Sequence, residues 1–443
     1  MIRPRPCRPT ARVRKESLDT IAADIPMARP VDTASPQMRP IGPQERLASM
    51  DVLRGVAILG IFMMNIQSFS MIGPAYMNPT AYGDLTGWNY AVWLVSHLFF
   101  DQQFLEVFSL LFGAGIIMMT ERSDAKGQPS KAMHYRRMVL FLLIGVLHAY
   151  LLWYHDILAA YALCGMLLFG FRRKSPRFLF LLGAAMLTVP IVVGAVTALL
   201  MKQLPPEQLQ NVLESFNPPA HLAQVEIDAY RGGWTGQMGT RAAEALFGQT
   251  FGFLGEMLWR AGGFILLGMA MMKLRLFGAD RSVRTYLVIA AIGMLIGVSL
   301  KLYGVHLNFL HDWDFRYWLP IGSKFSYVGS IALVLAWWAM IMLLCKLRVA
   351  PPLLACLAAI GQLSLSCYLM QTLIGTTIFY GHGFGLYGKV DRVGQFLIVL
   401  AVWAVQLILA PLWLRWFRFG PVEWCWRAVT YLTPPVMIRR ATG

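Results

Sequence analysis

The segment DVLRGVAILGIFMMNIQSFSM, residues 51–71, decides the fold of this chain. It is an apolar helix long enough to cross a bilayer, which takes about 20 residues. It also carries Asp51 and Arg54 near one end, and Asn65 and Gln67 near the other. Polar side chains at membrane depth are costly unless they have partners. We therefore predict a first membrane-spanning helix whose polar side chains face other helices.

The composition of the whole chain also indicates a membrane protein. Its 443 residues are 57% hydrophobic and only 14% charged, whereas a soluble protein carries about 25% charged residues. The net charge of +16 is not taken as a nucleic-acid signal, because the basic residues fall between apolar runs and not along one soluble face. The six cysteines form no CxxC pair, so we predict neither a disulfide framework nor a metal site.

The apolar runs predict the fold class, an all-α polytopic membrane bundle of about ten transmembrane helices. The fourth run is short, and the second contains a potential break near Asp101. The predicted spans are 52–71, 91–119, 138–155, 157–171, 178–200, 251–272, 285–303, 323–345, 353–379 and 395–414.

The distribution of Lys and Arg predicts the orientation of these helices. With the N-terminus in the cytoplasm, 29 of the 39 basic residues lie on the cytoplasmic side and 8 on the outer side. Positive residues are retained on the cytoplasmic side of membrane proteins. We therefore expect both termini to be cytoplasmic.

The predicted domain organisation is a membrane domain between two tails. Residues 1–48 form a basic, proline-containing tail whose composition favours disorder. Two other interpretations stay open: a transit peptide, or a true translation start at Met27 or Met38. Residues 49–431 form the multi-span membrane domain, and residues 432–443 form a cytoplasmic tail.

One connection on the predicted outer side is long, residues 201–249. It contains PPEQLQNVLESF and HLAQVEIDAYRGGW, separated by Asn217-Pro218-Pro219. Both halves have the pattern of amphipathic helices, and the prolines interrupt them. We expect an extracytoplasmic amphipathic loop that lies on the outer membrane surface as a lid.

Polar side chains from several predicted helices fall at a similar depth, in the middle and outer part of the membrane. The simplest interpretation is one water-accessible pocket that opens to the outer side. The alternative is a set of separate polar pairs that hold helices together. Histidines beside carboxylates are the more specific signal, because histidine exchanges protons near neutral pH. The residues are Asn65, His97, Asp101, His148, Asp156, Glu256, Arg260, Tyr368 and Gln371.

Six motifs, in their order and spacing, resemble the YeiB-like bacterial inner-membrane family, a domain of unknown function (418). They are RLASMDVLRGVAILGIFMMNI (46–66), FSLLFGAGI (108–116), GVLHAYLLWYHDILAAYALCG (145–165), GQLSLSCYLMQT (361–372), GHGFGLYG (381–388) and FGPVEWCWRAVTY (419–431). The family usually has Gly where this chain has His155, and Thr-Asn where it has Ser366-Cys367. The resemblance implies a multi-pass protein of the bacterial inner membrane.

The first helix also resembles that of membrane acyltransferases, the acyltransferase-3 and heparan glucosaminide acetyltransferase types. The resemblance rests on Asp51-Val52-Leu53-Arg54. The acyltransferase-3 proteins carry a histidine fourteen positions after this Asp, where the present chain has Asn65. An asparagine side chain forms hydrogen bonds but is no general base. Any catalytic role is therefore expected on another helix.

We weigh two functions. In the first, a membrane acyltransferase moves an acyl group to an extracytoplasmic acceptor, a small molecule, glycan or lipid, with His148 as base or acyl carrier and Asp156 orienting it. The other residues of the predicted pocket would bind substrate. Asp51 and Arg54 would have a structural or donor-side role, and Arg54 or Arg260 would face the phosphates of the donor.

The candidate donor is acyl-CoA, no bound cofactor is expected, and membrane lipids are the expected surroundings. The alternative function is a transporter or flippase for a small anionic or lipid-linked substrate. A structural or regulatory membrane protein remains the third reading.

Overall fold

The structure is a computed structural model that describes residues 47–127 and 129–439. These residues are helical, apart from connections and one isolated β-bridge between Phe417 and Ile438. The predicted all-α membrane bundle is confirmed. The predicted N-terminal tail lies almost wholly outside the described residues, and so does the end of the predicted C-terminal tail.

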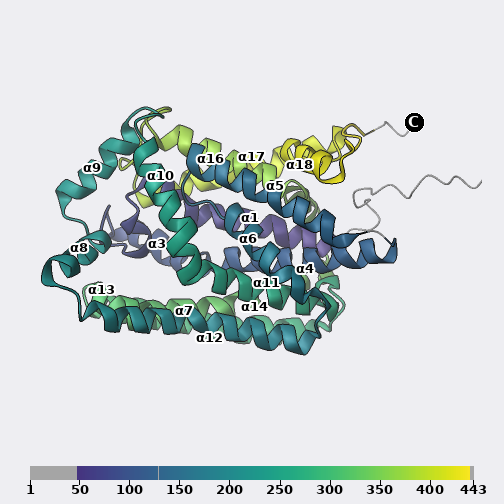
Figure 1. Cartoon of the computed structure of the whole chain (residues 1–443), viewed down its shortest axis with the longest axis horizontal. Helices are drawn as coiled ribbons and strands as arrows, with labels where there is room; N and C mark the ends of the chain where they lie inside the picture. Colours follow the sequence, from purple (N-terminus) through teal and green to yellow (C-terminus); the bar gives the residue numbers. More distant parts are fainter. Residues whose placement is uncertain (1–46, 128, 440–443) are drawn as a thin grey trace, which may run out of the picture. The chain divides into compact units, whose positions relative to one another are not determined.

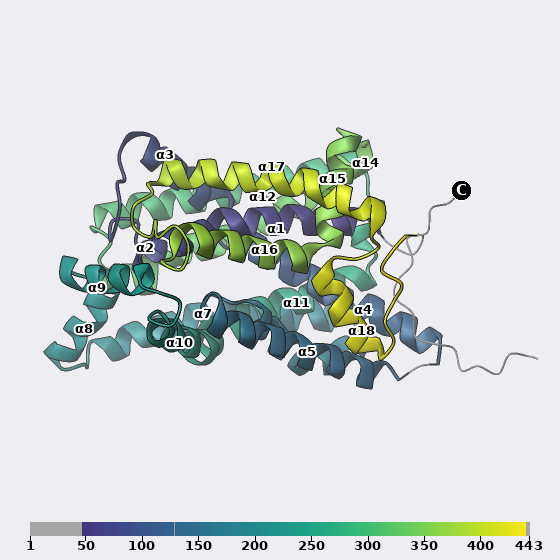
Figure 2. The same ribbon diagram turned by 90° about the horizontal axis from the view of Figure 1, so that it is seen from above.

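The helices run lengthwise beside one another, with α8 and α9 at one end and α18 at the other (Figures 1 and 2). Their bounds are α1 Ala48–Ser70, α2 Pro74–Met77, α3 Gly87–Phe99, α4 Gln103–Ala125, α5 Ser130–Leu151, α6 Leu158–Leu168, η2 Phe169–Arg173, α7 Pro176–Met201, α8 Pro206–Phe216, α9 Ala220–Arg231, α10 Met238–Phe247, η3 Gly248–Met257, α11 Leu258–Lys273, η4 Leu276–Gly278, α12 Val283–Leu310, α13 Phe315–Tyr317, η5 Trp318–Gly322, α14 Ser323–Leu347, α15 Pro351–Gln362, α16 Ser364–Phe379, α17 Arg392–Trp416 and α18 Pro421–Tyr431. The end that carries α8 and α9 is called the outer end, after the orientation that the charges predict.

Seven helical segments within the described residues are long and apolar enough to cross a membrane, and α15 with α16 makes an eighth if the bent pair is one span. The prediction of ten spans is therefore not reached. The predicted continuous span 353–379 is wrong, because α15 and α16 meet at 84°. The predicted span 157–171 contains α6, whose 11 residues extend only about 16 Å, less than the roughly 30 Å hydrocarbon thickness.

The short helix α6 pairs with α5 as an antiparallel hairpin. The start of α5 contacts the end of α6, where His134 lies 3.0 Å from the carbonyl oxygen of Gly165. The end of α5 contacts the start of α6 through His148 and Asp156. The chain thus enters and leaves this hairpin at the same end, so the predicted orientation of the other helices does not depend on whether the hairpin crosses the membrane.

The predicted break near Asp101 is confirmed, because α3 ends at Phe99 and α4 begins at Gln103. Gln102 at the break has a φ of 74°, which a non-glycine residue rarely adopts. Such a break releases backbone carbonyl groups from the helix, and these need other partners inside a membrane. The break therefore places polar backbone groups within an apolar bundle.

Helices α4 and α11 touch through their backbones. A Cβ atom at Gly113 would lie 1.9 Å from the carbonyl oxygen of Ile265, and one at Gly268 would lie 2.0 Å from that of Leu110. Small residues permit this close approach in membrane bundles. The contact holds α11 directly against α4, and these two helices carry the charged residues described below.

The outer end is covered by α8 and α9, which are separated at residues 217–219 (Figure 1). Glu226 on α9 accepts hydrogen bonds from the backbone N–H of Gly73 and the hydroxyl of Tyr387, both at 2.8 Å. Burial raises the pKa of Glu226, and these two hydrogen bonds oppose the shift. Helix α10 begins at Met238, inside the predicted loop 201–249, and continues without interruption into η3 and α11.

Candidate functional site

A buried histidine–aspartate pair lies where the α5–α6 hairpin turns. The Nδ1 atom of His148 is 2.9 Å from Oδ1 of Asp156, and the two side chains are 1% and 0% exposed. The other oxygen of Asp156 accepts a hydrogen bond of 2.7 Å from the N–H of Ala159 in the first turn of α6. The carboxylate is thus fixed by the helix start and in turn fixes the imidazole.

The second ring nitrogen of His148 faces a hydroxyl group. Its Nε2 atom lies 3.0 Å from Oγ1 of Thr372 on α16. An ionised carboxylate only accepts hydrogen bonds, so we assign the proton to Nδ1 and a free electron pair to Nε2 of the neutral ring. This is the arrangement of a general base directed at an O–H group.

Two other predicted site residues lie on the same helix, α16, as Thr372. The ring of Tyr368 packs on His148, with centroids 5.3 Å apart. Gln371 points elsewhere, because its Nε2 donates to Gln406 at 2.9 Å. Tyr368 therefore belongs to the His148 pair, whereas Gln371 connects α16 to α17.

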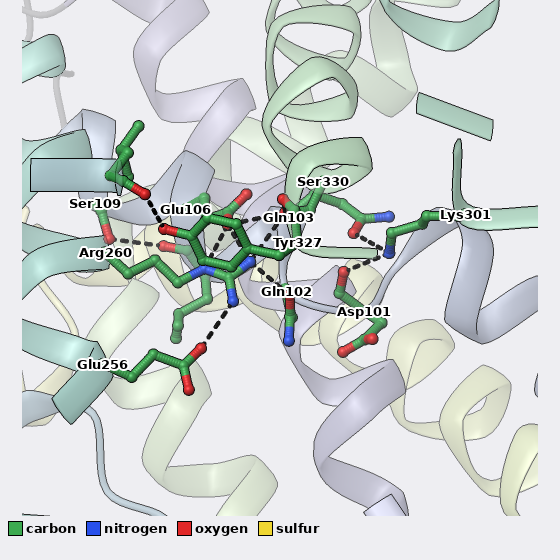
Figure 3. Close-up of polar contacts among 12 residues, drawn as sticks. Asp101, Gln102, Gln103, Glu106, Ser109, Glu256, Arg260, Lys301, Tyr327 and Ser330 are labelled. Carbon is green, nitrogen blue, oxygen red and sulfur yellow. Dashed lines mark hydrogen bonds and ion pairs between the residues drawn. The ribbon is translucent and has the colours of Figure 1, made fainter. Parts of the chain in front are cut away.

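A second cluster surrounds Arg260 at the contact of α4, α11 and α14 (Figure 3). The Nε and Nη2 atoms of Arg260 both donate to Oε1 of Glu106, and Nη1 donates to Glu256 at 3.0 Å. Nη2 also reaches Ser330 at 2.9 Å and Gln102 at 2.5 Å. The Arg260 side chain is 4% exposed, and each of its three guanidinium nitrogens donates at least one hydrogen bond.

The broken helix α3–α4 provides the other half of this cluster. The ammonium group of Lys301 donates to the carbonyl oxygens of His97 and Asp101 at 2.8 and 2.9 Å, and to Oε1 of Gln103 at 3.1 Å. His97 lies 3.1 Å from the carboxylate of Asp101, whose other oxygen accepts from the hydroxyl of Tyr76 at 3.2 Å. Lys301 thus satisfies the carbonyl groups that the break releases.

The predicted site residues do not form one hydrogen-bonded group. His148, Asp156 and Tyr368 form one cluster, and a second contains His97, Asp101, Glu256 and Arg260. Side chains in ring contact connect the two: Tyr76, which binds Asp101, packs on His155, and Trp153 packs on both His155 and His148.

The first helix contributes little to either cluster. Asn65 is half-buried, and its side chain forms no hydrogen bond within the described part of the chain. Arg54 binds Asp51 at 2.8 Å and approaches the carbonyl oxygen of Gly361 at 3.5 Å. These contacts connect α1 to the bend between α15 and α16.

Sequence reasoning missed two central residues. Lys301 lies near the end of the predicted span 285–303 and was not predicted as a site residue, but it lies within α12 and is fully buried. The signal for this was the unbroken helical stretch that continues through Lys301 to Leu310. Thr372 lies one helical turn after Tyr368, so their spacing indicates that the two side chains share one face of the helix. The spacing does not indicate the contact of Thr372 with His148, which is 224 residues away.

Comparison with known proteins places these features in a family. Residues 271–433 match a family model described as "Protein of unknown function (DUF418)". The chain is 30% identical over 397 residues to "Uncharacterized protein YeiB" of Escherichia coli (strain K12), covering 87% of this chain and 96% of that protein.

It is also 30% identical over 422 residues to "Uncharacterized protein YxaH" of Bacillus subtilis (strain 168), covering 89% and 97%. A further relative, an uncharacterised protein of Bacillus acidopullulyticus, is 24% identical over 421 residues. The matches extend over nearly the whole of these relatives and include both buried clusters. This chain is therefore a helical membrane protein that belongs to the YeiB-like family, DUF418.

Proposed function

We propose that this protein is a membrane acyltransferase of the bacterial inner membrane. It transfers an acyl group from a cytoplasmic acyl-CoA to a hydroxyl or amine of an extracytoplasmic small-molecule, glycan or lipid acceptor. The observation that carries the proposal is the buried pair of His148 and Asp156, with Nε2 of His148 directed at a hydroxyl group. The resemblance of the first helix to membrane acyltransferases supports the same reaction class.

The hydroxyl of Thr372 marks the position that the acceptor oxygen takes. In the proposed step, Nε2 of His148 removes the acceptor proton while the acceptor oxygen forms a bond to the thioester carbonyl carbon. The C–S bond then breaks, and the imidazolium returns its proton to the departing CoA thiolate. The carboxylate of Asp156 stabilises the imidazolium between these steps. The products are the acylated acceptor and free CoA.

The donor is expected to approach from the cytoplasmic end. Arg54 at that end is a candidate contact for its phosphates. Arg260 is a poorer candidate than the sequence indicated, because Glu106 and Glu256 already neutralise it. Its cluster instead supports the broken helix beside the catalytic pair.

The experiment measures transfer of a labelled acyl group from acyl-CoA in membranes that contain the protein. We expect His148→Ala to lower the rate at least 100-fold, because general base catalysis contributes about 10²–10⁴. Asp156→Asn should lower it as well, with the protein level unchanged. The control is His311→Ala, since His311 is exposed and bonds only a backbone carbonyl within the described residues. Equal transfer in wild type and His148→Ala would exclude this mechanism.

The alternative is a transporter or flippase, and one observation favours it. The Oε2 atom of Glu106 is buried and lacks a hydrogen-bond partner, beside Arg260 and close to Lys301. Ionisable groups inside membranes commonly form proton and substrate pathways. Uptake of a small anionic or lipid-linked substrate into proteoliposomes without acyl donor, abolished by Glu106→Gln, would support transport and reject the enzyme proposal.

A further inference from the structure

Thr372 completes a row of three side chains that begins at Asp156. The carboxylate of Asp156 lies 2.9 Å from Nδ1 of His148, and Nε2 on the other side of the ring lies 3.0 Å from Oγ1 of Thr372. All three side chains are buried. This order of carboxylate, imidazole and hydroxyl activates nucleophiles on many unrelated folds, and it is recognised by its geometry.

The hydroxyl of Thr372 favours His148 over its own helix. Its Oγ1 atom lies 3.4 Å from the carbonyl oxygen of Tyr368, four residues earlier, which is longer than the 3.0 Å to Nε2 of His148. Thr376, one turn later, donates to the carbonyl oxygen of Thr372 at 2.9 Å, which is the ordinary bond of a helical threonine. We therefore assign the proton of Thr372 to the bond with His148.

A second arrangement of carboxylate, imidazole and hydroxyl lies at the α3–α4 break, and its contacts are longer. Nδ1 of His97 is 3.1 Å from the carboxylate of Asp101, and Nε2 is 3.4 Å from Oγ of Ser326 on α14. This carboxylate also accepts from Tyr76, and Ser326 is only half-buried. The shorter contacts and full burial favour Thr372 as a nucleophile, and Ser326 provides a comparison within the same chain.

We propose that Thr372 is a nucleophile that carries the acyl group as an ester on its own hydroxyl. The inference rests on the proposed function and divides its transfer into two steps, with Thr372 as the first acceptor. In the first step, Nε2 of His148 removes the proton of Oγ1 while Oγ1 bonds to the thioester carbonyl carbon. The C–S bond breaks, and the imidazolium gives its proton to the CoA thiolate. The products are acyl-threonine and free CoA.

The second step returns Thr372 to its starting state. Nε2 of His148 removes a proton from the hydroxyl or amine of the extracytoplasmic acceptor, which bonds to the ester carbonyl carbon. The C–Oγ1 bond breaks, and the imidazolium returns the proton to Oγ1. Asp156 stabilises the imidazolium in both steps. Because the protein holds the acyl group between the steps, the cytoplasmic donor and the outer acceptor need not be bound together.

Both steps require the rings around the imidazole to move, because the three side chains are buried. The rings of Trp153 and Tyr368 pack on His148. The indole Nε1 of Trp153 is buried and has no hydrogen-bond partner within the described residues, so no hydrogen bond of this side chain fixes the ring. Its N–H group is also available to the negative charge that forms on the carbonyl oxygen during each step.

The first test incubates the purified full-length protein with radioactive acetyl-CoA or palmitoyl-CoA, without acceptor, and locates the covalent label by mass spectrometry. We expect up to one acyl group per chain, on Thr372, as an ester that alkaline hydroxylamine releases. Thr372→Val and His148→Ala should lose the label, whereas Thr372→Ser should keep it. Thr376→Val is the matched control on the same helix and should be labelled as the wild type is. A label on Ser326 instead of Thr372 would overturn the proposal.

The second test measures acyl transfer to the acceptor in membranes. Thr372→Val should lower the rate by about 100-fold or more, because it removes the nucleophile. Direct transfer from acyl-CoA to the acceptor would leave the rate of Thr372→Val close to that of the wild type. That result, together with loss of transfer in His148→Ala, would reject the acyl-threonine and leave the proposed function standing.

A fluorophosphonate probe separates failure of the nucleophile from failure of the acyl donor, since it reacts with activated hydroxyl groups without acyl-CoA. Oγ1 displaces fluoride from phosphorus, and His148 takes the proton. Labelling of Thr372 that requires His148, in a protein that transfers no acyl group, would support the nucleophile and reject the proposed function. Absence of both the acyl and the phosphonyl label from wild-type Thr372 would overturn the inference, whether or not Thr372→Val folds.

Discussion

Glu106 and Arg260 meet inside the bundle through one carboxylate oxygen, which accepts from both Nε and Nη2 of the guanidinium group. The residues are 154 positions apart, and the Gly113 contact between α4 and α11 brings their helices together. The same guanidinium binds Gln102 at the α3–α4 break. One arginine therefore joins a helix contact to a broken helix.

Replacement of only one residue of the Glu106–Arg260 pair should strongly destabilise the protein. We predict that Arg260→Met lowers the free energy of unfolding by about 3–5 kcal/mol, because it leaves Glu106 buried without its cation. The double variant Glu106→Leu with Arg260→Met should lose less than Arg260→Met alone. Denaturant unfolding in mixed detergent micelles measures both. A double variant as unstable as the sum of two single ones would show that the two charges do not act as a pair.

The backbone contact between α4 and α11 gives a second prediction with a control on the same helix. Gly113→Ala should destabilise the protein by about 1–3 kcal/mol or more, because its Cβ would meet the carbonyl oxygen of Ile265. Gly115 has open space at its Cβ position. Gly115→Ala should therefore be neutral or stabilise by up to about 1 kcal/mol. Thermal unfolding of the two variants distinguishes them, and a smaller loss at Gly113 than at Gly115 would contradict this packing.

Features that depend on composition and on local sequence pattern were predictable from the sequence. The apolar runs identified the membrane bundle, and Asp101 marked the break between α3 and α4. The hairpin of α5 and α6 was predicted as two spans, the second of them short. Hydropathy does not show that His134, at the start of α5, contacts Gly165 near the end of α6. The bend at Leu363 was missed as well, although the residues directly beside it, Gln362 and Ser364, are polar.

Contacts between residues far apart in the sequence were harder to predict than which polar residues belong to the site. Asp156 follows His148 by eight positions, so a hairpin turn suffices to join them, and sequence reasoning paired them. Lys301 reaches the α3–α4 break from about 200 residues away, and its contact depends on how α12 packs. In the folded chain the predicted pocket residues form two clusters, and the ring contact of Tyr76 with His155 lies between them.

We expect Lys301 to stabilise the break between α3 and α4. We predict that Lys301→Met destabilises the protein, because each buried carbonyl group left without a donor, at His97 and Asp101, costs about 1–3 kcal/mol. Hydrogen exchange of residues 97–106 should increase in this variant. Lys324→Met is the control, since Lys324 is half-buried and donates no hydrogen bond among the described residues. Unchanged exchange at the break in Lys301→Met would show that its carbonyl groups have other partners.

The attachment of α9 should depend on pH through Glu226. Burial raises its pKa above the usual 4.5, so the unfolded carboxyl group ionises first as the pH rises. The attachment is then strongest below pH 4.5 and weakens as the pH rises through the higher pKa of the attached state. The groups around it are Glu244, Tyr154, Tyr230, Tyr380 and Tyr387. Of these, Glu244 raises the pKa further, and the hydrogen bond from Tyr387 lowers it.

Glu226→Gln tests this directly, because the amide oxygen still accepts from Gly73 and Tyr387 but carries no charge. Hydrogen exchange of α9, corrected for the intrinsic pH dependence, should rise with pH in the wild type and stay constant in Glu226→Gln. Glu207→Gln on the exposed face of α8 should behave as the wild type. The same pH dependence in wild type and Glu226→Gln would assign the effect to another group. A pH-independent wild type would mean that α9 stays attached whether or not the carboxyl group is ionised.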